Sequence, residues 1–162
     1  LIKRCLGFEM KVYAYDPFVD QRIIESFGGI KVDDLNKSLK EIDILSLSVP
    51  LTEKTHNMIN LEKMKIMKKN AVIINTSRGR VVNEKDLNEA LNKGILYGAG
   101  LDVFAKEPPD NDNPLLKNKK ILLSPHAATL TKECTSNMSI ETVQNVIDFF
   151  EKKLNKLMIV KL

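Results

Sequence analysis

Short apolar runs, several of them rich in β-branched residues, alternate with amphipathic stretches along most of this 162-residue chain. Such alternation is typical of a parallel sheet whose strands are joined by helices. The residues expected in strands are 11–15, 42–49, 71–75, 95–101 and 121–123, with a shorter extended piece at 30–32. The residues expected in helices are 20–27, 33–40, 60–69, 83–94 and 131–153. The pattern therefore predicts an α/β fold built on a doubly wound parallel sheet.

Polar residues predict where three of these helices begin. Asp33, Asn60 and Asn83 each precede an amphipathic stretch, and their side chains are expected to cap it. The helix after Asn60 has an apolar stripe, which could line a cofactor pocket but more often packs in a core. That stripe consists of Leu61, Met64 and Met67. The last helix has a stripe of its own, formed by Val143, Val146, Ile147, Phe150 and Leu154.

Composition and charge exclude several classes of protein. A hydrophobic content of 43% and a charged content of 28% are ordinary for a globular chain. The net charge is +4, and no block of like charges predicts a nucleic-acid partner. No apolar run predicts a membrane helix, and charged residues interrupt the N-terminal stretch that a signal peptide would need. The cysteines, Cys5 and Cys134, predict reduced thiols in a cytoplasmic protein and no metal site.

Ligands of doubly wound sheets bind beyond the carboxyl ends of the strands, so the residues that follow each strand are the candidates for a site. Asp16 follows the first strand and could accept hydrogen bonds from ribose hydroxyls, or simply form a turn before Pro17. After residues 71–75 come hydroxyl side chains and Arg78, with Gly79 allowing close approach. That set suits an anionic small molecule, although a turn with a solvated arginine is an equal alternative.

Arg78, Glu107 and His126 follow three successive strands and can converge on one crevice. An arginine can hold a carboxylate through two parallel hydrogen bonds, and a histidine can give a proton to a carbonyl oxygen as hydride reaches the carbon. A glutamate bonded to the imidazole favours the charged form of the ring. Reduction of a 2-keto acid needs these roles and a nicotinamide as hydride source. His56, by contrast, has no supporting pattern around it.

Residues 11–153 resemble the NAD-binding domain of D-isomer-specific 2-hydroxyacid dehydrogenases, which include phosphoglycerate and D-lactate dehydrogenases. The matching motifs are VYAYDP, SLSVPLTEKT, MIN, AVIINTSRGRVVN, GAGLDVFAKEPP, NPLL and ILLSPHAA. The resemblance implies an NAD-dependent oxidoreductase that acts on the CH–OH group of D-2-hydroxy acids. It also implies a small-molecule 2-hydroxy or 2-keto acid substrate, and a homodimer in the full-length enzyme. The TSRGRVVN stretch is slightly closer to the phosphoglycerate or hydroxypyruvate branch.

The same resemblance implies a role for individual residues. Arg78 would bind the substrate carboxylate, His126 would be the acid/base, and Glu107 would be the partner of the histidine. Asp16 would bind the adenosine ribose, and because no basic residue directly follows it, NAD is favoured over NADP. The other cofactor contacts implied are those of Val49, Pro50, Thr55, Thr76, Ser77, Arg78, Asp102, His126 and Ala128.

The chain departs from the family pattern before residue 11. Those enzymes have a strand and a G-x-G-x-x-G turn just before the region that begins here, and the seven glycines of this chain do not form that motif. The expectation is therefore a Rossmann-like sheet that lacks its first, central strand and its glycine-rich turn. Residues 1–162 would be a partial dinucleotide-binding domain without the substrate domain, part of a longer enzyme and inactive alone.

Two other classes of function stay open. One is an NAD-sensing, corepressor-like binding protein of the same fold, which would keep the same residues. The other is a remnant that does not fold. Partner pull-down against substrate-dependent NADH oxidation would separate the first from an enzyme, and a thermal melt would identify the second.

Overall fold

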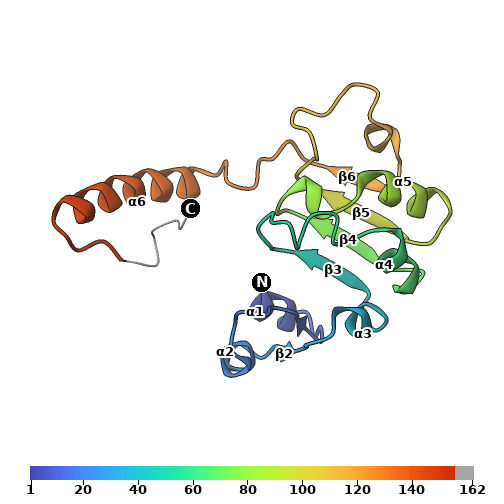
Figure 1. Cartoon of the computed structure of the whole chain (residues 1–162), viewed down its shortest axis with the longest axis horizontal. Coiled ribbons are helices and arrows are strands. Elements are labelled where there is room, and N and C mark those ends of the chain that lie inside the picture. The colour runs from blue at the N-terminus through green and yellow to red at the C-terminus, as the bar shows by residue number, and fades with distance from the viewer. Residues whose placement is uncertain (156–162) are drawn as a thin grey trace. The chain divides into compact units, whose positions relative to one another are not determined.

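The computed structural model describes residues 1–155 and divides the chain into two compact units, Leu1–Ser124 and Pro125–Leu162 (Figure 1). The strands, all in the first unit, are β1 Tyr13–Ala14, β2 Ile30–Lys31, β3 Ile44–Leu47, β4 Val72–Asn75, β5 Gly98–Leu101 and β6 Ile121–Leu123. The helices of that unit are α1 Ile2–Leu6, α2 Gln21–Ser26, α3 Leu35–Leu39, α4 Leu61–Ile66 and α5 Glu84–Asn92, with 3₁₀ turns at Gly79–Val81 and Pro114–Lys117. The second unit contains α6 Lys132–Phe150. None of the described helices is both long and apolar enough to cross a membrane.

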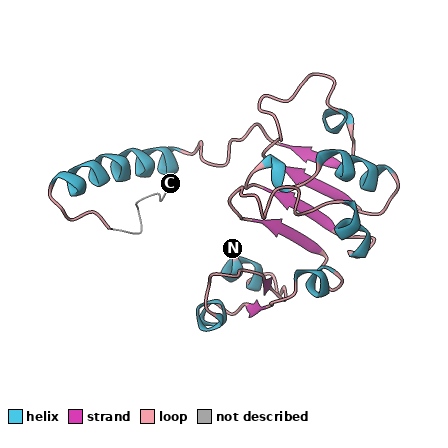
Figure 2. Cartoon of the chain, viewed as in Figure 1, coloured by secondary structure: helices cyan, strands magenta, loops and turns pink. Residues whose placement is uncertain are grey.

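The strands form two parallel sheets, which Figure 2 shows in magenta. One sheet pairs β1 with β2, and the other has the order β3-β4-β5-β6. A helix or longer connection joins each pair of neighbouring strands, as parallel pairing requires. The predicted α/β fold is therefore confirmed. In the described residues β1 and β3 belong to separate sheets, as expected for a Rossmann-like sheet that lacks its central strand.

The core lies between the four-stranded sheet and helices α4 and α5. Leu45, Ile73 and Ala99 lie side by side across the sheet and are buried. Met64 of α4 and Leu87 of α5 are fully buried in the same cluster. The stripe that includes Met64 therefore packs in the core and does not line a cofactor pocket, as is more frequent for such a stripe. Burial of such side chains is the main favourable term in folding.

The observed strands are shorter than the predicted ones, apart from residues 121–123. Only Tyr13–Ala14 of residues 11–15 and only Ile44–Leu47 of residues 42–49 form strand. These are the residues that pair with a neighbouring strand. Residues 95–97 are not strand. The backbone N–H groups of Ile95 and Leu96 donate to Ala90 O, at 2.8 and 3.4 Å, and so close the end of α5.

Two of the three predicted caps are confirmed. The side chain of Asn60 accepts from Lys63 N, and that of Asn83 accepts from Asp86 N. The prediction for Asp33 is wrong, because α3 begins one residue later and Asp34 caps it. In the second unit Thr131 caps α6. The predicted apolar stripe of α6 is largely exposed within its own unit, with exposed fractions of 60% for Val143, 54% for Val146, 43% for Ile147 and 77% for Phe150.

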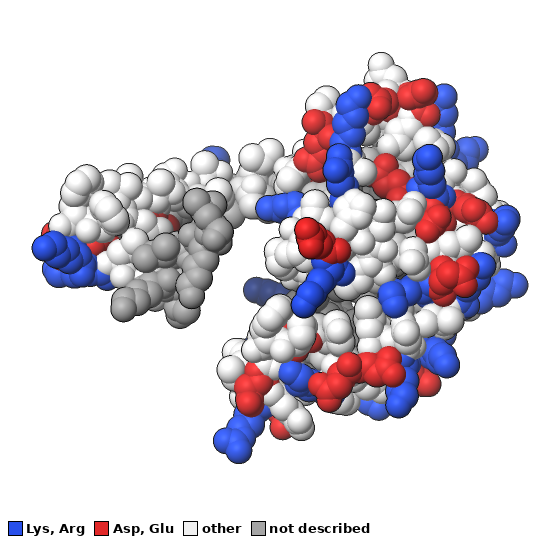
Figure 3. Space-filling model, in the orientation of Figure 1, with Lys and Arg blue, Asp and Glu red and all other residues white. Residues whose placement is uncertain are grey.

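Basic and acidic side chains are interspersed over the visible surface of the first unit (Figure 3). Several form exposed ion pairs, such as Lys65 with Glu62 and Lys93 with Glu89, both at 2.7 Å. The hydrogen bond and charge of Lys93 lower the pKa of the Glu89 carboxyl. Exposed pairs of this kind contribute little to stability.

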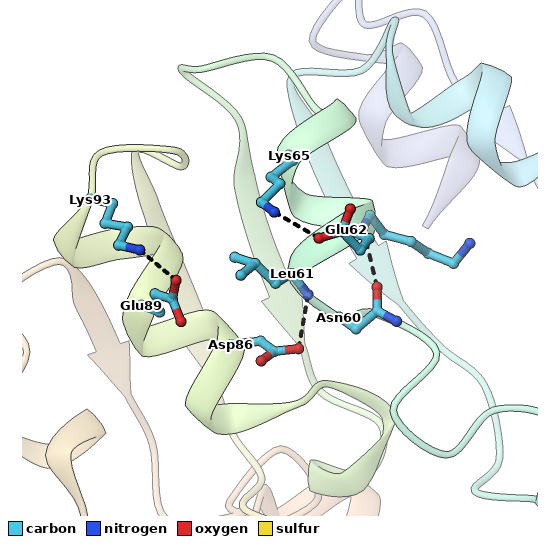
Figure 4. Close-up of polar contacts among 8 residues, drawn as sticks. Asn60, Leu61, Glu62, Lys65, Asp86, Glu89 and Lys93 are labelled. Atoms are coloured by element: carbon cyan, nitrogen blue, oxygen red, sulfur yellow. Dashed lines mark hydrogen bonds and ion pairs between the residues drawn. The ribbon is translucent and has the colours of Figure 1, made fainter.

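One hydrogen bond joins the first turns of α4 and α5 (Figure 4). Asp86 Oδ2 accepts from Leu61 N at 2.9 Å, while Asp86 N donates to Asn83 Oδ1. The Asp86 carboxylate therefore lies in the first turn of its own helix and at the start of another. Both positions favour negative charge.

We expect Asp86→Ala to lower the free energy of unfolding by about 1–2 kcal/mol, because Leu61 N loses its acceptor. The control is Glu62→Ala, which removes an exposed ion pair and should change stability by less than about 0.5 kcal/mol. Urea unfolding followed by circular dichroism measures both. Equal losses in the two variants would contradict the special role of Asp86.

Candidate functional site

The four strands of the larger sheet end in register at one edge. Leu47, Asn75, Leu101 and Leu123 are paired neighbours across β3, β4, β5 and β6. The chain segments that follow these strands therefore begin at the same edge. Within the first unit this brings together residues 48–50, 76–78 and 102, three of the segments in which the sequence predicts cofactor contacts.

The turn after β4 is held by Asn75, whose side chain is buried, with 1% exposed. Asn75 Oδ1 accepts from Ser77 N at 3.1 Å and from Ser77 Oγ at 2.8 Å, while Asn75 Nδ2 donates to Arg78 O at 3.0 Å. Thr76 and Arg78 are exposed, whereas Ser77 is buried. Asn75 is not among the site residues predicted from the sequence. The signal available there was a polar residue that ends an otherwise apolar strand.

Arg78 keeps donors available for a ligand. Its Nη1 donates to Ser77 O at 2.7 Å, which restrains one terminal nitrogen of the guanidinium, and no hydrogen bond of Nε or Nη2 occurs within residues 1–155. A guanidinium has five N–H donors, so a carboxylate can still be bound.

Gly79 has a different role from the expected one. A Cβ atom at this position would lie 1.9 Å from the Phe104 carbonyl carbon and 2.4 Å from Ala105 N. The sequence predicted that Gly79 leaves room for a ligand, but backbone fills that room. The contact places the Arg78 turn against the segment that leads to Glu107. Arg80 Nε adds a hydrogen bond to Ala105 O at 3.2 Å.

Asp102 and Glu107 follow β5 in very different environments. Asp102 is buried, with 6% exposed, and its backbone N–H donates to Asn75 O at 3.0 Å. Glu107 is exposed, and its Oε1 accepts from Phe104 N at 2.9 Å. That bond closes the short loop after the strand. The pairing of Glu107 with His126 stays a prediction.

Asp16 forms a turn, which is one of the two roles that the sequence predicted for it. Its Oδ1 accepts from Phe18 N at 2.8 Å and from Val19 N at 3.2 Å. Within residues 1–155, Asp16 Oδ2 has no hydrogen-bond partner, and the residue is half-buried. Because one oxygen forms the turn and the other is open, the turn and the predicted ribose contact are compatible.

The loop after β3 closes on itself. Thr55 Oγ1 donates to Pro50 O at 2.7 Å and accepts from Thr52 N at 2.8 Å. Val49 is half-buried and Pro50 is exposed. These residues are predicted cofactor contacts, and the hydrogen bonds give their loop a defined shape.

His126 and Ala128 belong to the second unit, whereas Arg78, Asp102 and Glu107 belong to the first. His126 is exposed and has φ = 54°, in the left-handed region that few non-glycine residues adopt. The convergence of Arg78, Glu107 and His126 on one crevice therefore stays a prediction. Among the residues described, no group of three His, Cys, Asp or Glu side chains is arranged to bind a metal ion.

Comparison with known proteins extends these observations. Residues 1–128 match the family described as "D-isomer specific 2-hydroxyacid dehydrogenase, NAD binding domain". A glyoxylate reductase of Korarchaeum cryptofilum is 44% identical over 147 residues, which are 91% of this chain and 44% of that protein. A D-3-phosphoglycerate dehydrogenase of Methanocaldococcus jannaschii is 44% identical over 133 residues, 82% of this chain and 25% of that protein.

Solved structures agree with the sequence matches. The structure of D-lactate dehydrogenase from Aquifex aeolicus complexed with NAD and lactic acid has a TM-score of 0.81 and 34% identity, over 94% of this chain and 50% of that one. An NAD-complexed D-isomer specific 2-hydroxyacid dehydrogenase from Lactobacillus delbrueckii has a TM-score of 0.84 and 30% identity, over 96% and 50% of the two chains. The chain thus spans about half the length of these structures, or less than half in the case of the two enzymes matched by sequence.

Proposed function

The chain belongs to the family of D-isomer-specific 2-hydroxyacid dehydrogenases, and from this membership we propose that residues 1–162 supply the dinucleotide-binding part of an NAD-dependent oxidoreductase. The enzyme would interconvert a D-2-hydroxy acid and its 2-keto acid. The observation that carries the proposal is the edge of the four-stranded sheet, where the Asn75-held turn and Asp102 begin side by side. The relatives named above are enzymes, which favours this function over that of a corepressor-like binding protein.

The donor set of the first unit fits a dinucleotide. Asp16 Oδ2 is open to accept hydrogen bonds from ribose hydroxyls. Along the sheet edge the cofactor would contact Val49, Pro50, Thr55, Thr76, Ser77, Arg78 and Asp102, and in the second unit His126 and Ala128. Bound NADH would supply the hydride for the reduction.

Side chains of this protein would bind the substrate carboxylate and transfer the proton. The open donors of Arg78 would bind the substrate carboxylate and fix the keto carbon in position. His126 would donate a proton to the keto oxygen during reduction and accept it back during oxidation. Glu107 would orient the imidazole and favour its charged form. The names of the relatives point to glyoxylate or hydroxypyruvate as first substrates to test.

The cytoplasmic location expected from the cysteines, and the homodimer that the family resemblance implies for the full-length enzyme, are also parts of this proposal. The cysteine content supports the first, because two cysteines do not make a disulfide framework.

We expect the 162-residue chain to bind NADH with a submillimolar Kd, and Asp16→Ala to weaken binding about tenfold. Titration calorimetry measures both values, and Asp43→Ala, which removes only an exposed ion pair with Lys68, is the control. Because the 162 residues alone are expected to be inactive, hydride transfer would be tested in the longer enzyme that contains them, as NADH oxidation with glyoxylate or hydroxypyruvate that is lost in His126→Asn. Absence of NADH binding by a chain with a cooperative melt would disprove the proposal.

A further inference from the structure

Lys31 joins the second strand of the smaller sheet to the turn that contains Asp16. Lys31 is the last residue of β2 and pairs in register with Ala14 of β1, two residues before Asp16. Its Nζ donates to Asp16 O at 2.9 Å and to Val19 O at 2.5 Å. Asp16, Val19 and Lys31 are all half-buried. The ammonium therefore binds both the first and the last residue of the turn.

The turn is held from two sides at once. The Asp16 carboxylate accepts from the N–H groups of Phe18 and Val19, and the Lys31 ammonium donates to carbonyls of the same segment. Hydrogen bonds with a charged partner are stronger than neutral ones. If the ammonium were removed, the carbonyls of Asp16 and Val19 would need water as donor, and the turn would gain conformational freedom.

We infer that Lys31 is a positioning residue for the adenosine ribose of the cofactor. By fixing the turn, it holds the Asp16 carboxylate in the orientation in which Oδ1 bonds the backbone and Oδ2 is open to a ribose hydroxyl. Lys31 acts through Asp16 and needs no contact with the cofactor. This inference rests on the proposed NAD-binding function.

Lys31→Met tests the inference, because methionine keeps an unbranched side chain but removes the N–H donors. We expect affinity for NADH and for ADP-ribose to fall about tenfold, with affinity for nicotinamide mononucleotide unchanged within about twofold. Lys31→Arg, which restores donors, should recover affinity to within about threefold of the wild type. A general loss of structure would weaken all three ligands alike.

Lys120→Met is the matched control. Lys120 Nζ also donates to a backbone carbonyl, Leu91 O, at 2.5 Å, but at the end of α5 rather than in the Asp16 turn. The affinity of the Lys120→Met variant for NADH should equal that of the wild type. A thermal melt of each variant, followed by circular dichroism, shows whether the chain is folded.

A double variant shows whether Lys31 acts through Asp16. Adding Lys31→Met to Asp16→Ala should reduce affinity by less than about twofold more, because the carboxylate to be positioned is gone. A wild-type chain that does not bind NADH would overturn the proposed function and this inference together. Loss of affinity in Asp16→Ala with none in Lys31→Met would overturn the inference alone. If Lys31→Met does not fold, a folded Lys31→Arg chain with tenfold weaker binding would also overturn it.

Discussion

The Gly79→Ala variant is expected to unfold at a much lower urea concentration than the wild type, with a loss of at least about 3 kcal/mol in the free energy of unfolding. The added Cβ would lie 1.9 Å from Phe104 C and 2.0 Å from Phe104 O. These atoms belong to backbone, so no side-chain rotation can relieve the overlap. Either the turn after β4 or the segment after β5 must move, and Gly79 is itself buried.

Gly94→Ala is the control for this variant. Gly94 has φ = 67°, but a Cβ there would meet no atom within 4 Å. Gly94→Ala should therefore lower the free energy of unfolding only by the backbone strain of a left-handed alanine, about 1–2 kcal/mol. A smaller loss in Gly79→Ala than in Gly94→Ala would mean that the two segments separate easily. NADH titration of Gly79→Ala below its unfolding transition would then show how far the site tolerates that separation.

Features set by neighbouring residues in the sequence were predictable. The β-branched run of residues 71–75 predicts β4, and its observed bounds differ by one residue. Asn60 and Asn83 cap their helices because an N-cap needs only the next few backbone N–H groups. The turn formed by Asp16 is equally local. The cap prediction for Asp33 was wrong for a local reason as well, because the next residue is also an aspartate and the helix begins one position later.

Features set by tertiary contact could not be read from the sequence. Nothing next to Gly79 in the chain indicates that the backbone of Phe104 lies against it. The bonds from Lys31 to Asp16 and Val19 span 15 and 12 positions and depend on the pairing of β1 with β2. Asn75 is a different case, because it lies within the recognised motif AVIINTSRGRVVN and its side chain bonds only to residues 77 and 78. The sequence does not show that its amide, and not a neighbouring hydroxyl, is the buried group that holds the turn.

Asn75→Ala should lower the free energy of unfolding by about 3 kcal/mol, more than loss of a single hydrogen bond would. The amide is 1% exposed and makes three hydrogen bonds, with Ser77 N, Ser77 Oγ and Arg78 O. Alanine removes all three hydrogen bonds at once, and the buried N–H and O–H groups of Ser77 then need water as their partner. Because Arg78 O is one of those partners, the placement of the guanidinium should loosen as well.

Ser77→Ala separates these contributions. It removes the bond from Oγ but leaves Asn75 Oδ1 to accept from the backbone N–H of residue 77 and Asn75 Nδ2 to donate to Arg78 O. Its expected cost in the free energy of unfolding is about 1 kcal/mol. Urea unfolding of both variants, with NADH titration of the folded chains, measures the difference. If Asn75→Ala costs no more than Ser77→Ala, the turn is held by its own backbone, and Asn75 is a buried polar residue rather than the anchor of Arg78.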